Sequence, residues 1–206
     1  PDKVDVPADR QFVGFDSYKK AIDSLRPGDV VLLTTHAAFR PMHFEYAANK
    51  GVNVFAEKSF ATDGPAVRRW LKAAEVAEQK NLKVGVGFMW RHSKARQEVI
   101  GRIHDGMIGD VHTLRIYRVH GPVYCPPRPA DQNELEYQVR RFHSFLWASG
   151  GNYSDFYIHI IDHLSWMKNA WPVKAQAVGG RHYRQSPDGV TYVDQNFDLY
   201  GVEYTY

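Results

Sequence analysis

Residues 30–58 read VVLLTTHAAFRPMHFEYAANKGVNVFAEK, and this pattern predicts a strand, a helix and a second strand. The apolar run Val30–Leu33 is unbroken, as in strands that a parallel sheet buries on both faces. The helix over Pro41–Lys50 ends at Gly51, and a second apolar run, Val52–Phe55, leads to Lys58. Lys58 therefore falls at the carboxyl end of a strand, where open α/β sheets place their chemistry.

Elements on either side continue this alternation. A short amphipathic helix is predicted over Phe15–Leu25, and a longer one starts after Asp63 and runs to about Gln79. Lys83–Phe88 is another apolar strand. Strands and helices that alternate with short loops predict a doubly wound parallel sheet, which we place in residues 1–90. The longer helix is expected to turn four side chains inward: Val67, Leu71, Ala74 and Ala77.

Residues 91–206 have a different pattern. Long alternating strands, typical of an antiparallel sheet covered on one face, are predicted at residues 111–119, 173–183 and 195–206. Helices are predicted at residues 93–105, 133–147 and 153–168. The predicted fold class is therefore α/β, with a partial Rossmann-type parallel sheet followed by an α+β domain that has an open, mainly antiparallel sheet.

A second informative stretch is residues 155–162, which read DFYIHIID. On a helix, Asp155, His159 and Asp162 share one face, because they are spaced by four and then three residues. An imidazole and carboxylates that meet a lysine in one cleft would form a proton-transfer site. Each residue also has a simpler explanation, since Lys58 can be a solvated strand end and His159 a packed histidine among isoleucines.

Composition excludes several classes of function. The formal charge is only +3 and the basic residues are dispersed, so no nucleic-acid partner is expected. Cys125 is the only cysteine, which excludes an internal disulfide and a cysteine-based zinc site. The histidine spacings match no metal motif, so no metal is predicted. No apolar stretch is long enough to span a membrane, so no membrane partner is expected, and the expected location is the cytoplasm unless an export signal precedes residue 1.

Three motifs follow one another along the chain. Residues 56–58, Ala-Glu-Lys, end the second strand, and residues 106–110 form a Gly-Met-Ile-Gly-Asp turn. Gly150-Gly151 then precedes the Asp155, His159 and Asp162 pattern. In this order the motifs resemble the Glu-Lys-Pro, Gly-x-Ile-Gly-Asp and Gly-Gly…Asp-x-x-x-His-x-x-Asp elements of the Gfo/Idh/MocA oxidoreductases, which include glucose–fructose oxidoreductase and inositol dehydrogenase. The resemblance covers most of residues 12–206.

The resemblance implies an NAD(P)-dependent oxidoreductase that transfers a hydride between a nicotinamide cofactor and a sugar, cyclitol or related polyol, with NAD favoured over NADP. Residues 1–90 would be the C-terminal part of a dinucleotide-binding domain, and residues 91–206 a substrate and oligomerisation domain that is incomplete at its C-terminus. The family's glycine-rich turn, G-x-G-x-x-G, does not occur in this sequence. We therefore expect it before residue 1, and expect this fragment alone to be inactive.

The family's catalytic positions correspond to Lys58, Asp155 and His159. His159 would take the hydroxyl proton, Lys58 would stabilise the developing alkoxide, and Asp155 would bind a neighbouring hydroxyl or tune the pair. Cofactor contacts are predicted from residues near the ends of the parallel strands: Thr34, Thr35, His36, Glu57, Lys58 and Trp90. Substrate contacts are predicted for Arg91, Tyr157 and Asp162.

Several of these roles have structural alternatives. Thr34–His36 can be an ordinary turn after a strand, and Asp162 can be a structural carboxylate that binds backbone or arginine. His43 is expected to pack or cap rather than to catalyse. Four further residues can line a sugar pocket or simply occupy a helix surface: Tyr137, Arg140, Arg141 and His143.

Two departures from the family pattern leave other functions open. Ser59 stands where the family has proline, so the Lys58–Ser59 bond is expected to be trans, and Tyr157 stands where glycine is common. A relative that cleaves glycosides through transient NAD oxidation and elimination remains an alternative, as does a non-catalytic sensor on the same fold.

The last predicted strand carries Tyr200, Tyr204 and Tyr206 on one face. Because helices can cover only one side of the sheet, an open face rich in aromatic residues predicts a homo-oligomer that assembles through the C-terminal sheet.

Tight NAD binding is not expected from this chain alone. Without the glycine-rich helix start that holds pyrophosphate, several charge-assisted hydrogen bonds of about 1.5–3 kcal/mol each are missing. Isothermal titration calorimetry of the 206-residue chain with NAD should therefore give a dissociation constant weaker than micromolar. Micromolar or tighter binding would show that the phosphate site lies within residues 1–206.

Overall fold

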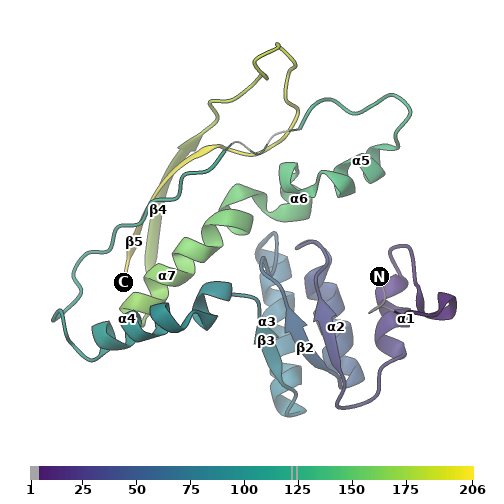
Figure 1. The fold of residues 1–206 in the computed structure, drawn as a ribbon, viewed down its shortest axis with the longest axis horizontal. Helices are drawn as coiled ribbons and strands as arrows, with labels where there is room; N and C mark the ends of the chain where they lie inside the picture. The colour runs from purple at the N-terminus through teal and green to yellow at the C-terminus, as the bar shows by residue number, and fades with distance from the viewer. Residues whose placement is uncertain (1–4, 122, 124) are drawn as a thin grey trace. The chain divides into compact units, whose positions relative to one another are not determined.

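The structure is a computed structural model that describes residues 5–121, 123 and 125–206. It divides the chain into two compact units, Pro1–Gly87 and Phe88–Tyr206. The two units follow one another along the chain, as the colour of the ribbon shows (Figure 1).

The first unit contains a parallel three-stranded sheet in the order β1-β2-β3. Its strands are β1 (Val30–Leu33), β2 (Asn53–Ala56) and β3 (Val84–Val86). The register places Leu33 beside Ala56 and Ala56 beside Val86, so the three strands end at one edge. The helices of this unit are η1 (Ala8–Arg10), α1 (Ser17–Asp23), α2 (Arg40–Lys50) and α3 (Gly64–Gln79).

One face of the parallel sheet packs against α2 and α3. Leu33, Val54 and Ala56 share this face, and all three are buried. The other face carries Val30 and Leu32, which are 56% and 65% exposed. The core of the unit consists of Ile22, Leu33, Phe44, Ala47, Ala48, Val52, Val54, Ala56, Ala73 and Ala77.

Local sequence signals set the ends of the two long helices. Gly51 ends α2 with φ 89°, a left-handed conformation that suits glycine, and its N–H bonds to the carbonyl of Ala47. Asp63 caps α3. The prediction that Val67 and Leu71 face inward is wrong, because they are 47% and 58% exposed.

The other two predicted residues do face inward, because Ala77 is buried in the core and Ala74 packs against it. Trp70 and Ala73 complete the inner face, in place of Val67 and Leu71.

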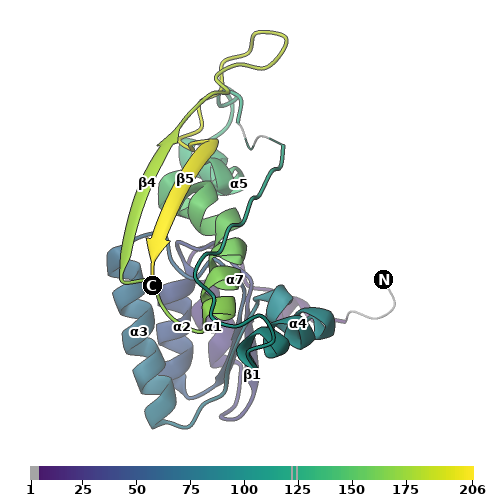
Figure 2. The same ribbon diagram turned by 90° about the vertical axis from the view of Figure 1, so that its left-hand side faces the viewer.

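The second unit contains mainly helices and one two-stranded antiparallel sheet. The helices of its first half are η2 (Met89–His92) and α4 (Lys94–His104). The middle of the unit contains α5 (Glu134–Arg140), η3 (Phe142–Ser144), α6 (Leu146–Ser149), the π-helical turn η4 (Tyr153–Tyr157) and α7 (Ile158–Lys168). The sheet pairs β4 (Lys174–Gly180) with β5 (Leu199–Thr205), as Figure 2 shows.

Two predicted elements of this unit differ from the structure. Residues 111–119, all of them among those described, form no strand. With residues 202–206, residues 111–115 line a cavity of about 620 Å³, and no backbone ladder joins them to β5. The helix predicted at residues 133–147 is broken into α5, η3 and α6, because Arg141 (φ −107°, ψ 31°) and Phe145 (φ −117°, ψ 123°) leave the helical conformation.

The aromatic face of β5 is the covered face, not the open one. Tyr153 packs against Tyr200 at 5.7 Å, and the hydroxyls of Tyr206 and Ser165 lie 3.3 Å apart. The predicted open tyrosine face is therefore wrong, because the alternation of the strand turns these rings toward η4 and α7. The outer face instead presents Leu199, which is 66% exposed. Assembly through the sheet remains a prediction.

The parallel sheet followed by a separate antiparallel sheet confirms the predicted fold class. Among the described residues, no helix has both the length and the apolar character needed to cross a membrane.

The cap of α3 should contribute measurably to stability. The Oδ1 atom of Asp63 accepts a hydrogen bond of 2.7 Å from the N–H of Ala66. Asp63→Ala should lower the free energy of unfolding by about 1 kcal/mol, while Asp63→Asn keeps the acceptor and should lose much less. Urea unfolding of the three proteins tests this, and equal losses in both variants would assign the effect to charge at the helix start rather than to the hydrogen bond.

Candidate active site

The carboxyl edge of the parallel sheet gathers most of the predicted cofactor residues. Thr34–His36 follow β1, and Glu57 and Lys58 follow β2. The N–H of Glu57 bonds to the carbonyl of Leu33 at 3.1 Å, and the N–H of Gly87 bonds to that of Ala56 at 2.8 Å. The hydrogen bonds between neighbouring strands therefore continue to the carboxyl end of each strand. They hold the turns that follow the strands in line with one another.

Arg40 forms hydrogen bonds with both of these turns. It is 5% exposed, and its guanidinium donates to the carbonyl of Glu57 at 2.8 Å and to those of Thr35 and Ser59. The sequence did not single out Arg40. Arg40 is the first residue of α2, where a positive charge is unfavourable because it opposes the helix dipole. This unfavourable position was the sequence signal that Arg40 has a role outside the helix.

The Lys58–Ser59 peptide bond is cis, so the prediction of a trans bond is wrong. Ser59 is 1% exposed, and its carbonyl is one of those held by Arg40. Lys58 itself is half-buried.

The carboxylate of Glu57 lies over the backbone of Gly87. A Cβ atom at Gly87 would come 2.4 Å from Oε2 of Glu57. Glycine at this position therefore leaves room for the carboxylate at the end of β3.

His43 packs beneath the same edge. Its Nδ1 lies 3.0 Å from Oγ1 of Thr35, and its ring stacks on Tyr18 with centroids 4.2 Å apart. Burial lowers the pKa of His43 to about 4, and the positive charge of Arg40 adds to this effect. The ring is therefore neutral at neutral pH and belongs to the packing of the unit.

In the second unit, Asp155, His159 and Asp162 are all buried, with exposed fractions of 6%, 7% and 8%. They lie on successive turns of η4 and α7, and each meets a different partner. His159 lies against Trp90 and Phe88, with ring centroids 5.4 Å and 6.3 Å away.

Asp162 binds Arg91 through two oxygens. The guanidinium donates from Nε at 2.9 Å to Oδ2 and from a terminal nitrogen at 2.7 Å to Oδ1, and it also lies 4.7 Å from the Trp166 ring. Asp162 is therefore bound to an arginine, as in the structural alternative given for it above. Substrate roles for Arg91 and Asp162 remain predictions.

Trp90 belongs to a cluster that joins α4 to α7. Arg96 stacks on its ring at 4.3 Å and reaches Nε2 of His163 at 2.7 Å. Burial lowers the pKa of His163, and Arg96 lowers it further. A neutral His163 can accept the hydrogen bond from Arg96, so this cluster favours the uncharged ring.

Asp155 pairs with His143, which the sequence gave only as one of four possible pocket residues. The Nδ1 of His143 and Oδ2 of Asp155 are 2.5 Å apart. Of the other three, Tyr137 is buried against Cys125, Arg140 pairs with Glu136 at 2.8 Å, and Arg141 is exposed. The structure places only His143 beside a predicted catalytic residue.

Tyr157 does not share the face of Asp155. Its ring meets Tyr200 of β5 edge-on at 5.2 Å, and it lines a cavity of about 310 Å³ between α7 and β5. A spacing of two residues turns a helical side chain to the opposite side, and substrate binding by Tyr157 remains a prediction.

No family model matches the chain. The chain is 26% identical over 111 residues to dTDP-3,4-didehydro-2,6-dideoxy-alpha-D-glucose 3-reductase from Actinomadura kijaniata, a match that covers 54% of the chain and 30% of the reductase.

Solved structures agree with this match. Myo-inositol 2-dehydrogenase from Lactobacillus plantarum has a TM-score of 0.56 and 25% identity, over 79% of this chain and 44% of that one. The apo form of scyllo-inositol dehydrogenase from Lactobacillus casei has a TM-score of 0.57 and 26% identity, over 80% of this chain and 43% of that one.

The chain spans less than half the length of these relatives. The resemblance to Gfo/Idh/MocA-type oxidoreductases is confirmed. Within the described part of the chain, no group of three or more histidine, cysteine, aspartate or glutamate side chains could hold a metal ion.

The buried neutral His43 should make stability depend on pH. The unfolded chain takes up a proton on this ring near its ordinary pKa of about 6.5, whereas the folded protein does so only near a pKa of about 4. As the pH falls between these values, the free energy of unfolding should decrease, by on the order of 2 kcal/mol. His43→Gln should make this decrease smaller, and His112→Gln, at an exposed histidine, should leave it unchanged. Urea unfolding from pH 7.5 to 4.5 measures the difference, and parallel curves for wild type and His43→Gln would contradict it.

Proposed function

We propose that the chain provides the catalytic face of an NAD(P)-dependent oxidoreductase that acts on a sugar, cyclitol or related polyol. The observation that carries the proposal is the buried polar face of η4 and α7, where Asp155 and His159 lie one turn apart. The likeness to two inositol dehydrogenases at 25% and 26% identity supports the substrate class.

The residues of the first unit fit the nicotinamide end of such a cofactor. Thr34, Thr35 and His36 offer hydroxyl, imidazole and backbone groups at the carboxyl edge of a parallel sheet, the usual place for a dinucleotide. Gly87 leaves room for the carboxylate of Glu57 at this edge. When bound, the cofactor would supply the acceptor or donor of the hydride.

This chain's residues would orient the substrate and handle its proton. His159 would take the hydroxyl proton, since an imidazole can change its charge near neutral pH. Lys58 would hold the same oxygen as negative charge develops on it, a contribution that strengthens when water is excluded. The role of Lys58 requires that the edge of the first unit meets the face of α7 in the active protein.

Turnover by the longest natural protein that contains this sequence tests the proposal. It should produce NADH or NADPH with at least one member of a panel of inositols and aldoses. Release of an aglycone without net NADH would instead support transient oxidation and elimination. Binding of a polyol without turnover would support a sensor, and either result would overturn the proposal.

Variants of the same protein test the two assigned residues. Lys58→Ala and His159→Gln should each lower kcat by about 10²–10⁴-fold, with much smaller effects on the free energy of unfolding. The matched controls are Lys94→Ala and His112→Gln, which remove an exposed lysine and an exposed histidine. Unchanged kcat in Lys58→Ala would remove that lysine from the mechanism.

A further inference from the structure

The pairing of His143 with Asp155 fixes which nitrogen of the ring carries hydrogen. The two atoms, Nδ1 and Oδ2, are 2.5 Å apart, and an ionised carboxylate can only accept a hydrogen bond. Nδ1 must therefore be the donor. In the neutral ring, Nε2 then carries the lone pair and can only accept.

The ring of His143 is held in place but remains accessible. It packs against Phe142 and Phe156, with centroids 3.9 Å and 5.6 Å away. Its side chain is 44% exposed, whereas that of Asp155 is 9% exposed. A buried carboxylate thus orients a ring whose other edge reaches the surface.

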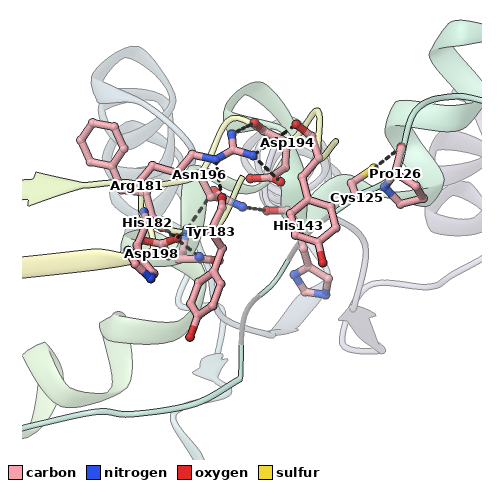
Figure 3. Close-up of polar contacts among 12 residues, drawn as sticks. Cys125, Pro126, His143, Arg181, His182, Tyr183, Asp194, Asn196 and Asp198 are labelled. Carbon is pink, nitrogen blue, oxygen red and sulfur yellow. Dashed lines mark hydrogen bonds and ion pairs between the residues drawn. The ribbon is translucent and has the colours of Figure 1, made fainter. Parts of the chain in front are cut away.

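The backbone of η3 is fixed by the segment that leads into β5 (Figure 3). Nδ2 of Asn196 donates to the carbonyl of His143 at 2.6 Å, and the N–H of Gln195 donates to that of Ser144 at 2.8 Å. Asn196 is 3% exposed. Side chain and backbone of His143 are therefore positioned by separate parts of the chain, as expected of a binding group rather than of a loose surface histidine.

We propose that His143 determines specificity by accepting, at Nε2, a hydrogen bond from a second hydroxyl of the substrate. The inference rests on the proposed function, and it narrows the substrate class to polyols that carry a hydroxyl near the reacting one. Asp155 and His159 lie one helical turn apart, about 5–6 Å between Cβ atoms, which is within the span of one sugar or cyclitol. Asp155 is the positioning residue, because it acts through His143.

An acceptor fixed in this way selects against other groups at the same place. A hydroxyl can donate to Nε2, whereas a hydrogen atom leaves the acceptor unpaired and a carboxylate or carbonyl meets it lone pair to lone pair. The deoxy analogue should therefore be a poorer substrate.

The first test is the tautomer of His143 in the 206-residue chain. Long-range ¹H–¹⁵N correlation of the histidine side chains, with His143 assigned by its loss in His143→Leu, should show the Nδ1–H form. Asp155→Ala should shift it toward the Nε2–H form that free imidazole favours. An Nε2–H ring in the wild-type chain would overturn the proposal.

The second test compares myo-inositol with its mono-deoxy analogues in the longest natural protein that contains this sequence. For one analogue, kcat/KM should fall about 10–100-fold in the wild type, as expected for loss of a hydrogen bond in a desolvated site. His143→Leu should remove this discrimination, because it lowers kcat/KM on myo-inositol to about the value for the deoxy analogue. His120→Leu, at an exposed histidine whose ring stacks on Phe156 at 5.0 Å, should keep it. Discrimination that persists in His143→Leu would overturn the proposal.

Failure of the proposed function gives a different result. If the wild-type protein turns over no polyol, titration of the chain with myo-inositol still tests whether His143 binds a polyol hydroxyl. A change in the ¹⁵N shift of Nε2 of His143, absent in the other histidines, would support polyol recognition without redox chemistry, and no change would overturn it.

Discussion

The buried guanidinium of Arg40 is the constraint on which the functional edge of the parallel sheet depends. A charge that is 5% exposed is stable only when its N–H groups are hydrogen-bonded, and the groups nearby are the carbonyls of Thr35, Glu57 and Ser59. The two turns after β1 and β2 must therefore keep these three carbonyls directed at the guanidinium of Arg40. These turns carry the candidate cofactor residues. The hydrogen bonds of Arg40 therefore constrain the positions of those residues.

The second unit uses buried carboxylates in the same way. Asp155 and Asp162 each meet a cationic or hydrogen-donating side chain from elsewhere in the chain, His143 and Arg91. An ionised carboxylate needs donors when it is buried, so its partner is held as firmly as the helix that carries it. Two carboxylates on η4 and α7 are thus each held by a residue outside these two helices.

Local rules account for much of what could be predicted from the sequence. The apolar run before Thr34, the glycine after α2 and the aspartate before α3 each act within a few residues, and the parallel sheet follows from them. The predictions that differ from the structure depend on pairing between distant parts of the chain. Residues 111–119 alternate like a strand, but a strand also needs a neighbour at hydrogen-bonding distance. The partnership of His143 with Asp155 spans twelve residues and joins η3 to η4, and no periodicity encodes it.

The contact between Glu57 and Gly87 has an evolutionary consequence. The carboxylate occupies the volume that a methyl group at position 87 would need, and it is the mobile end of a flexible side chain. Replacement of Gly87 by alanine would turn the carboxylate away from β3 while leaving residue 57 unchanged. A lineage could in this way redirect a negative charge at the sheet edge through one neutral-looking substitution on a neighbouring strand, so that positions 57 and 87 diverge as a pair.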